Sequence, residues 1–178
     1  MATGSESETT TSRRRPRVAL REVTPNDAAL LETRQSSEFN ELGPPDEELL
    51  AAKAPSFRLL VVRDDDEPVG YVTWRRVRYG PNRESRAWNI GVSIIPSARG
   101  QGYGTEAQRL LAVHLFATTD VNRVEAATDV ANLAEQRALE RAGFIREGIL
   151  RGAQFRAGSW HDLVYFSLLR KETLRRGP

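Results

Sequence analysis

Hydrophobic and polar positions follow two different periods along this chain. Short segments with a two-residue alternation, or short apolar runs bounded by turn residues, predict strands. We expect seven of them, at 17–23, 57–62, 69–74, 88–95, 123–128, 144–156 and 161–169. In 88–95, Trp88 and Ile90 share one face, whereas Asn89, Gly91 and Ser93 share the other. A face of small and polar residues is typical of a ligand passing close to the strand, or of an ordinary solvent-facing side.

Apolar residues three and four positions apart predict helices between these strands. The predicted helices are 25–38, 46–53, 105–118 and 132–141. The stripe of 105–118 contains Ala107, Leu111 and Leu115 together with His114. We therefore expect His114 to be a hydrogen-bonded core residue rather than a base. Strands flanked by helices, with hairpins at both ends, predict a mixed α/β sheet rather than an all-parallel one.

A glycine-rich turn, Arg99-Gly100-Gln101-Gly102-Tyr103-Gly104, joins strand 88–95 to helix 105–118. Glycines let a backbone approach a ligand closely, and the free N–H groups at a helix start favour phosphate. A dinucleotide-binding turn would need a glycine where Thr105 stands, and a P-loop would need a lysine, which is absent nearby. The turn predicts an anion site that neither of these two motifs explains well.

The Arg-x-x-Gly-x-Gly pattern, preceded by Pro96, resembles the acyl-CoA pyrophosphate loop of the GNAT acetyltransferase superfamily. Asn132-Leu133-Ala134 and the later Leu139-Glu140-Arg141-Ala142-Gly143-Phe144 are similar to the family's later helix and the Gly-Phe that ends it. The segment 148–169 is similar to the ribosomal-protein-acetylating (RimJ/RimL) branch. The resemblance covers about residues 17–171. It implies a central mixed, mostly antiparallel sheet of about seven strands, flanked by about four helices and splayed between strands four and five.

The resemblance also implies acetyl-CoA as the acyl donor and a primary amine as the acceptor, with direct attack on the thioester and no covalent enzyme intermediate. Arg99 would add positive charge beside the pyrophosphate. The backbone residues expected to bind the pyrophosphate are Gly100, Gln101, Gly102, Tyr103, Gly104 and Thr105. The pantetheine arm would lie along Val92, Ser93 and Ile94, where a backbone N–H would polarise the thioester carbonyl. Asn132 would lie near this arm, with helix capping as its alternative role.

Three positions depart from the family's pattern of proton-transfer residues. Asn89 stands where the branch often carries a glutamate base, and Leu139 where the superfamily often has a tyrosine acid. Asn89 is therefore a catalytic candidate only as a group that orients the amine. Glu135 stands where the branch tends to have serine, and it interrupts the apolar stripe of helix 132–141. If it is buried, its pKa should rise, which would suit proton transfer near neutral pH; the alternative is a structural ion pair with Arg137 or another arginine.

Composition narrows the chemistry further. The chain has no cysteine and only two histidines, which argues against disulfides, a cysteine nucleophile and a metal centre. Its net charge of +2 is spread over a mixed surface, so we expect no nucleic-acid partner. No apolar run approaches the roughly 20 residues of a membrane span, so we expect a cytoplasmic protein without a membrane partner.

The predicted organisation is a disordered tail at 1–16, one acetyltransferase domain at 17–171 and a C-terminal tail at 172–178. The acceptor is either a protein N-terminus or a small-molecule amine, and the acidic segment 38–48 slightly favours a cationic one. Further candidates for acceptor contact are Glu38, Asn40, Glu41, Arg78, Tyr79 and Trp160. A non-catalytic acyl-CoA-binding module and a nucleotide-binding protein are the alternative functions. The oligomeric state is left open, with a homodimer among the candidates.

Overall fold

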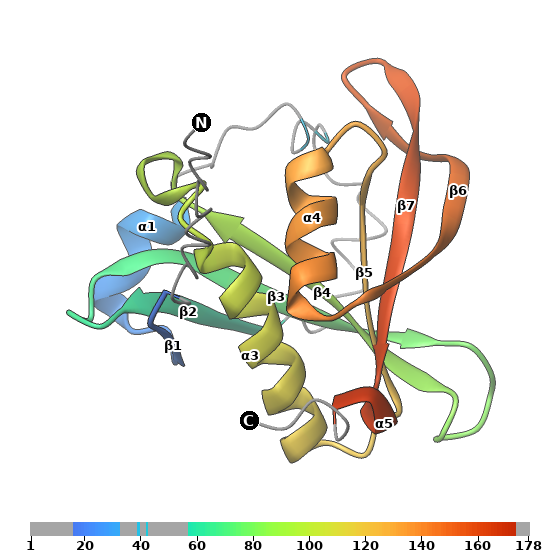
Figure 1. Cartoon of the computed structure of the whole chain (residues 1–178), viewed down its shortest axis with the longest axis horizontal. Coiled ribbons are helices and arrows are strands. Elements are labelled where there is room, and N and C mark those ends of the chain that lie inside the picture. The colour runs from blue at the N-terminus through green and yellow to red at the C-terminus, as the bar shows by residue number, and fades with distance from the viewer. Residues whose placement is uncertain (1–15, 33–38, 40–41, 43–56, 174–178) are drawn as a thin grey trace, which may run out of the picture.

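A seven-stranded sheet forms the centre of the protein (Figure 1). The computed structural model describes residues 16–32, 39, 42 and 57–173. The sheet order is β1-β2-β3-β4-β5-β7-β6, and only the β4–β5 pair is parallel. The strands are β1 (Val18–Arg21), β2 (Phe57–Arg63), β3 (Pro68–Arg78), β4 (Arg86–Ile94), β5 (Arg123–Asp129), β6 (Ile145–Arg156) and β7 (Ser159–Leu169). The seven predicted strands and the mixed, mostly antiparallel sheet are confirmed.

Helices α3 and α4 lie across one face of this sheet (Figure 1). The described helices are α1 (Ala28–Glu32), α3 (Tyr103–Thr118), α4 (Leu133–Ala142) and the single turn α5 (Arg170–Thr173). Short 3₁₀ turns at Pro25–Asp27 and Pro96–Ala98 precede α1 and the glycine turn. The predicted helix 46–53, the end of helix 25–38 and nearly all of the predicted N-terminal tail lie outside the described residues.

The core lies between the sheet and α3 and α4. Its largest fully buried side chains include Leu111 and Leu115 from α3, Leu139 from α4 and Phe166 from β7. The Gly-Phe predicted to end α4 does so, since Gly143 adopts a left-handed conformation with φ of 104° and Phe144 enters the core.

The buried stripe of α3 is turned relative to the predicted one. Gln108, Ala112 and Phe116 are buried, whereas His114 is exposed, with its ring in an edge-to-face arrangement with Trp74 at a centroid distance of 6.3 Å. The expectation of a core histidine is therefore wrong. Because α3 contacts α4 as well as the sheet, its buried surface includes positions that a single apolar stripe does not predict.

The parallel ladder between β4 and β5 stops early. It consists of Ala87↔Arg123, Trp88↔Val124 and Asn89↔Glu125, and both strands then continue without pairing to each other. The predicted separation of strands four and five is thus confirmed, and it begins directly after Asn89 and Glu125. Beyond this point β4 pairs with β3 and no longer with β5.

Candidate active site

The glycine turn brings a row of free backbone N–H groups to the start of α3. Gly100 and Gly102 have φ of 73° and 88°, which is the left-handed region that non-glycine residues rarely adopt. Gly102 is the N-cap, and its carbonyl accepts the first helical hydrogen bond, from the Glu106 N–H at 3.1 Å. Within the described residues the N–H groups of Tyr103, Gly104 and Thr105 have no acceptor. Such a helix start, with its positive dipole end, suits an anion.

Two side chains of this turn form hydrogen bonds with backbone carbonyls that precede it. The Arg99 Nε donates to the Ile94 carbonyl at 3.0 Å, and the Gln101 Nε2 donates to the Ser97 carbonyl at 3.2 Å. Arg99 remains exposed and keeps the other donors of its guanidinium. The turn is therefore held against the end of β4 with a positive charge beside it.

The end of β4 provides an open backbone edge next to the turn. Val92, Ser93 and Ile94 pair with β3 but have no partner on the β5 side. The β3–β4 contact is close here, because a Cβ built on Gly70 would lie 2.1 Å from the Ser93 carbonyl oxygen. This tight pairing fixes the strand while leaving its other edge available to an extended ligand.

The two asparagines of the predicted site lie on different elements. Asn89 is half-buried at the last β4–β5 pair, on the sheet face opposite α3, so the structure puts it where the strands part. The Asn132 side chain accepts a hydrogen bond from the Glu135 N–H at 3.2 Å and so caps α4.

Glu135 lies in the first turn of α4, where that helix faces α3. Its side chain is half-buried, and burial raises the pKa of its carboxyl to about 7, an effect that a hydrogen bond from Gln108 only partly offsets. Gln108 itself is fully buried and donates to the Gly104 carbonyl at 3.2 Å, which links the carboxylate to the glycine turn. Ala131 and Ala134 are exposed, so the apolar stripe around Glu135 is narrower than predicted. No ion pair to Glu135 is found among the described residues.

A second carboxylate, which the sequence analysis did not identify, lies where β4 and β5 separate. Glu125 is fully buried, on the same sheet face as its register partner Asn89. It accepts hydrogen bonds from the Tyr79 hydroxyl at 2.5 Å, the Arg123 Nε at 2.8 Å and the Tyr165 hydroxyl at 3.3 Å. The signal was a glutamate in the middle of an otherwise buried strand, where an unpaired charge would be costly.

The network around Glu125 extends to the surface. Arg123 also makes a two-pronged contact with Glu147, at 2.7 and 2.6 Å, and this contact lowers the pKa of Glu147 to about 2. Burial and the neighbouring Glu125 raise the pKa of Tyr79 to about 12. Tyr79, Tyr165 and Arg123 line a cavity of about 620 Å³ that opens on the face opposite α3.

Asp129, the last residue of β5, connects this end of the strand to its neighbours. Its carboxylate accepts from the buried Arg156 at 2.5 Å and from the Ala131 N–H at 2.7 Å, and it lies 3.3 Å from the His161 Nδ1. These contacts connect β5 to α4, β6 and β7. They hold the far strand in place where it has left β4.

The predicted acceptor contacts have mixed outcomes. Glu38, Asn40 and Glu41 lie outside the described residues. Arg78 is exposed, and Trp160, which is 68% exposed, packs edge-on against Phe155 with a centroid distance of 5.4 Å. The Tyr79 hydroxyl is committed to Glu125, as described above.

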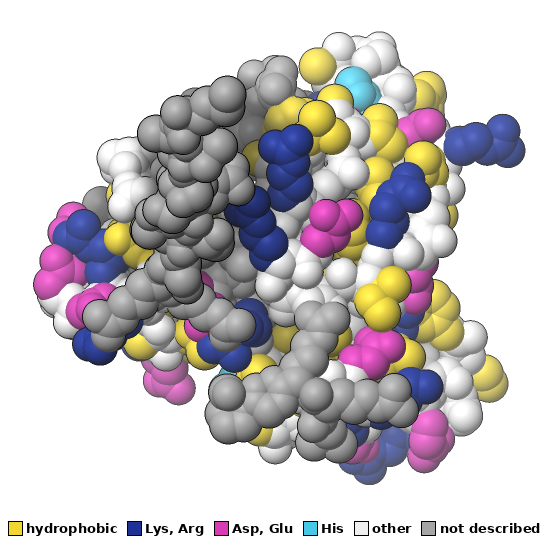
Figure 2. All heavy atoms as spheres, in the orientation of Figure 1, with side chains coloured by type: hydrophobic (Ala, Val, Ile, Leu, Met, Phe, Trp, Pro, Cys, Tyr) yellow, Lys and Arg dark blue, Asp and Glu magenta, His cyan; other side chains and the backbone are white. Residues whose placement is uncertain are grey.

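Charges of both signs are interspersed over the face that carries α3 and α4 (Figure 2). In the part of the chain that the structure describes, no three metal-binding side chains of His, Cys, Asp or Glu come together. None of the described helices has the length and apolar character needed to cross a membrane.

Several known proteins with similar sequences are named as acetyltransferases. Residues 17–145 match the family model described as Acetyltransferase (GNAT) domain. The putative ribosomal N-acetyltransferase YdaF of Bacillus subtilis is 38% identical over 88 residues, which is 49% of this chain and 48% of YdaF. The probable N-acetyltransferase YjcK of the same organism is 32% identical over 105 residues, 59% of this chain and 56% of YjcK. The match thus spans about half the length of these curated relatives.

Solved structures share the fold over most of the chain. Mycobacterium smegmatis RimJ in complex with CoA-disulfide superposes with a TM-score of 0.70 at 23% identity, covering 87% of this chain and 83% of that one. Spermidine N-acetyltransferase from Vibrio cholerae in complex with CoA and spermine has a TM-score of 0.70 at 19% identity, covering 88% and 98%. At these identities the likeness concerns the fold. Taken with the family match, which covers well over half of the sequence, it leads to one conclusion: this chain belongs to the GNAT acetyltransferase family.

Proposed function

We propose that the protein is an N-acetyltransferase that moves an acetyl group from acetyl-CoA to a primary amine by direct attack in a ternary complex. The observation that carries this proposal is the combination at the N-terminal end of α3. Free N–H groups of the glycine turn, an open edge of β4 and a carboxyl with a pKa of about 7 lie next to one another in the fold. Several relatives are named N-acetyltransferases, and two structural neighbours are complexes with CoA or its disulfide.

The residues present fit the donor. Its pyrophosphate carries negative charge, which the turn from Gly100 to Thr105 accommodates with backbone N–H groups and with Arg99. Its pantetheine arm contains amides, which can pair with the free edge of Val92, Ser93 and Ile94 as an added strand would. Asn132 would contribute there mainly by fixing the start of α4, because its side-chain oxygen already accepts from the Glu135 N–H.

The chemistry forms a bond between the amine nitrogen and the acetyl carbon and breaks the bond from that carbon to sulfur. The amine releases a proton to solvent water as the new bond forms, and the departing thiolate gains one. Glu135 is the group proposed to supply the second proton, since a carboxyl with a pKa of about 7 is partly protonated at neutral pH. Gln108 would hold this carboxyl toward the cofactor end of α3.

Asn89 and Glu125 are proposed to act on the acceptor side without removing a proton. Asn89 can orient the amine through its side-chain amide. Glu125 is already engaged by three donors, from Arg123, Tyr79 and Tyr165, so we assign it to holding these side chains at the mouth of the cavity. The cavity wall is partly apolar, with Ile149 and Leu150, which suits the carbon chain of an amine.

The central test is acetyl transfer to a panel of amines and peptides, followed by detection of the free CoA thiol. Glu135→Gln should lower kcat by about 10²- to 10⁴-fold, the usual contribution of a general acid or base, and should flatten the pH profile of kcat near pH 7. The Kd for acetyl-CoA should stay unchanged, because the two side chains have nearly the same shape. Glu140→Gln is the matched control, since Glu140 is exposed on the same helix.

A Glu135→Gln enzyme with full turnover and an unchanged pH profile would remove this carboxyl from the mechanism. Cofactor binding without thiol release on any acceptor would instead favour the non-catalytic acyl-CoA-binding module. Asn89→Ala separates the two sides of the reaction, because it should raise the acceptor KM while leaving the Kd for acetyl-CoA as it is.

The acceptor panel should cover both kinds of acceptor that occur in the names of the relatives and neighbours, ribosomal proteins and polyamines, with the former represented by peptides. A peptide carrying a free N-terminus and the same peptide with a blocked one form a matched pair. Turnover of the free peptide alone identifies a protein N-terminus as the acceptor. Turnover of polyamines alone identifies a small-molecule amine.

A further inference from the structure

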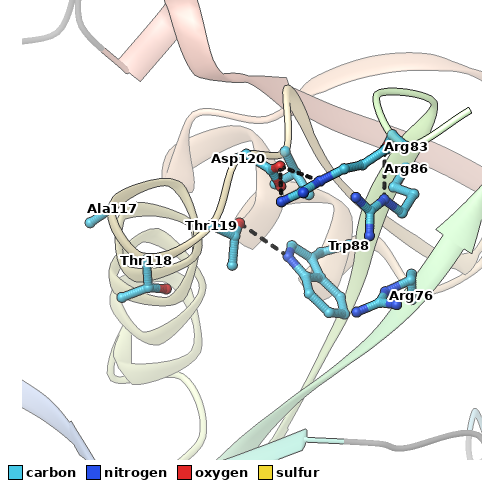
Figure 3. Close-up of a pocket in the computed structure, with 9 residues that line it drawn as sticks. Arg76, Arg83, Arg86, Trp88, Ala117, Thr118, Thr119 and Asp120 are labelled. Carbon is cyan, nitrogen blue, oxygen red and sulfur yellow. Dashed lines mark hydrogen bonds and ion pairs between the residues drawn. The ribbon is translucent and has the colours of Figure 1, made fainter.

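A pocket of about 460 Å³ lies at the C-terminal end of α3, away from the glycine turn (Figure 3). It is formed where the β3–β4 hairpin faces the last turn of the helix. Its lining residues are Arg76, Arg83, Arg86, Trp88, Ala117, Thr118, Thr119, Asp120 and Val121. Since α3 has 16 residues at about 1.5 Å each, roughly 24 Å of helix separates this pocket from the glycine turn.

Three arginines reach into this pocket from the hairpin (Figure 3). Arg83 is paired with Asp120, at 2.8 Å. Arg86 donates only its Nε, to the Arg83 carbonyl at 2.6 Å, and Arg76 lies over the Trp88 ring with its guanidinium carbon 5.4 Å from the centroid. Neither Arg76 nor Arg86 forms a close ion pair with a carboxylate among the described residues, although the charge of Arg86 acts together with Arg83 to lower the pKa of Asp120. Two guanidinium groups therefore keep most of their donors free.

The register of the hairpin explains why these charges gather. Arg76 is paired with Trp88, and Arg78 with Arg86, so all four side chains project on the sheet face that carries α3. Like charges placed this close repel one another unless an anion joins them. Asp120 is the one acidic residue in the lining. The lining thus carries three positive charges and one negative charge.

The negative end of the helix dipole does not cancel this charge. Arg170 donates to the carbonyls of Phe116, Thr119 and Val121, at 2.6, 2.6 and 2.8 Å, and so places its own positive charge at the C-terminal end of α3. The Thr118 and Thr119 hydroxyls donate to helix carbonyls at 2.8 and 2.6 Å, and the Trp88 Nε1 donates to the Thr119 hydroxyl at 3.3 Å. The side-chain donors that remain available in the pocket are therefore those of the arginines.

We propose that this pocket binds the phosphate group of a small phosphate ester, at a site separate from that for acetyl-CoA. A phosphate dianion would match the excess of two positive charges in the lining. Guanidinium forks bind phosphate oxygens in pairs, which gives such contacts both strength and orientation. Because Arg83 is already paired with Asp120, Arg76 and Arg86 would supply most of the contacts to the phosphate.

The test is calorimetric titration of the full-length protein with glycerol phosphate, in the presence of saturating CoA so that the glycine turn is occupied. Glycerol and sulfate at matched ionic strength are the comparison ligands. Arg76→Gln and Arg86→Gln should each weaken binding at least about tenfold, the value of one charge-assisted hydrogen bond. Arg151→Gln, which changes an exposed arginine on β6 without a carboxylate partner among the described residues, should leave the Kd unchanged.

Binding that survives the double variant Arg76→Gln/Arg86→Gln, or that glycerol or sulfate reproduces with the same Kd, would overturn the proposal. So would binding that vanishes when CoA is added, because the ester would then occupy the glycine turn. A short single-stranded RNA that binds through the same arginines while glycerol phosphate does not would also overturn it, in favour of a nucleic-acid contact. Because the readout is binding, the result does not depend on whether the protein transfers acetyl groups.

Discussion

The two ends of α3 both concentrate positive potential, but they do so with different parts of the chain. At the N-terminal end the donors are backbone N–H groups of Tyr103, Gly104 and Thr105, within one run of consecutive residues. At the C-terminal end they are arginine side chains from the β3–β4 hairpin, assembled next to a helix end that Arg170 neutralises. One site is local in the sequence, and the other exists only after the sheet has formed.

This difference determines how each end responds to change. Backbone donors cannot be removed by replacing a side chain, so the first site is sensitive to residues that set the backbone angles. Side-chain donors can be removed one at a time, so the second site should weaken in steps. The first site should also show an all-or-none dependence on its glycines.

Gly102→Val should give the largest effect. Gly102 has φ of 88°, which a β-branched residue adopts only with strain, so the N–H groups that follow it should lose their common direction. We expect acetyl-CoA affinity to fall about 100-fold or more, and the stabilisation by acetyl-CoA in thermal unfolding to disappear. Calorimetry and thermal unfolding with and without acetyl-CoA measure both.

Gly158→Val is the matched control for this prediction. Gly158 has a similar φ of 82° and open space around its Cα, but it lies in the β6–β7 turn. It should cost comparable stability and leave acetyl-CoA affinity intact. Equal loss of affinity in both variants would show that the glycine turn has no special part in binding.

The same contrast explains what the sequence could predict. The glycine turn, the early end of the β4–β5 ladder and the cap at Asn132 depend on neighbouring residues or on a family pattern, and each is found where it was expected. The arginine pocket and the Glu125 network depend on register between strands distant in sequence, so no local pattern indicates them. The burial of His114 was predicted wrongly for the same reason, since α4 shifts the buried side of α3.

Arg170→Ala should give the next largest effect, at the other end of the helix. It would remove four hydrogen bonds to three carbonyls and the stacking over Phe116, so we expect a loss of about 2 kcal/mol in the free energy of unfolding. Denaturant unfolding measures this directly. Acetyl-CoA affinity should change little, because the glycine turn lies at the opposite end of α3.

Arg170→Lys sharpens the result. Lysine keeps the positive charge near the helix end, but its single ammonium group cannot donate to three carbonyls as the planar guanidinium of arginine does. Arg170→Lys should therefore restore only part of the lost stability. Full restoration would mean that the charge alone matters at this helix end. A large loss of acetyl-CoA affinity in either variant would contradict the independence of the two ends.

The smallest predicted effect is on the free energy of unfolding, and it concerns the pH dependence that Glu135 contributes near the N-terminal end of α3. Burial raises the pKa of Glu135, near the N-terminal end of α3, to about 7. A group whose pKa is raised on folding stabilises the native state while it is protonated, and this contribution is lost as the pH rises through the folded pKa. Between pH 6 and pH 8 the native state releases this proton while the unfolded chain, with an ordinary glutamate, has already lost it. The free energy of unfolding should therefore fall by about 1 kcal/mol over that interval.

Glu135→Gln should abolish this dependence and Glu140→Gln should preserve it, as measured by denaturant unfolding at each pH. If the Gln variant retains the full pH dependence, the titrating group lies elsewhere, and the proton proposed for the departing thiolate must have another source.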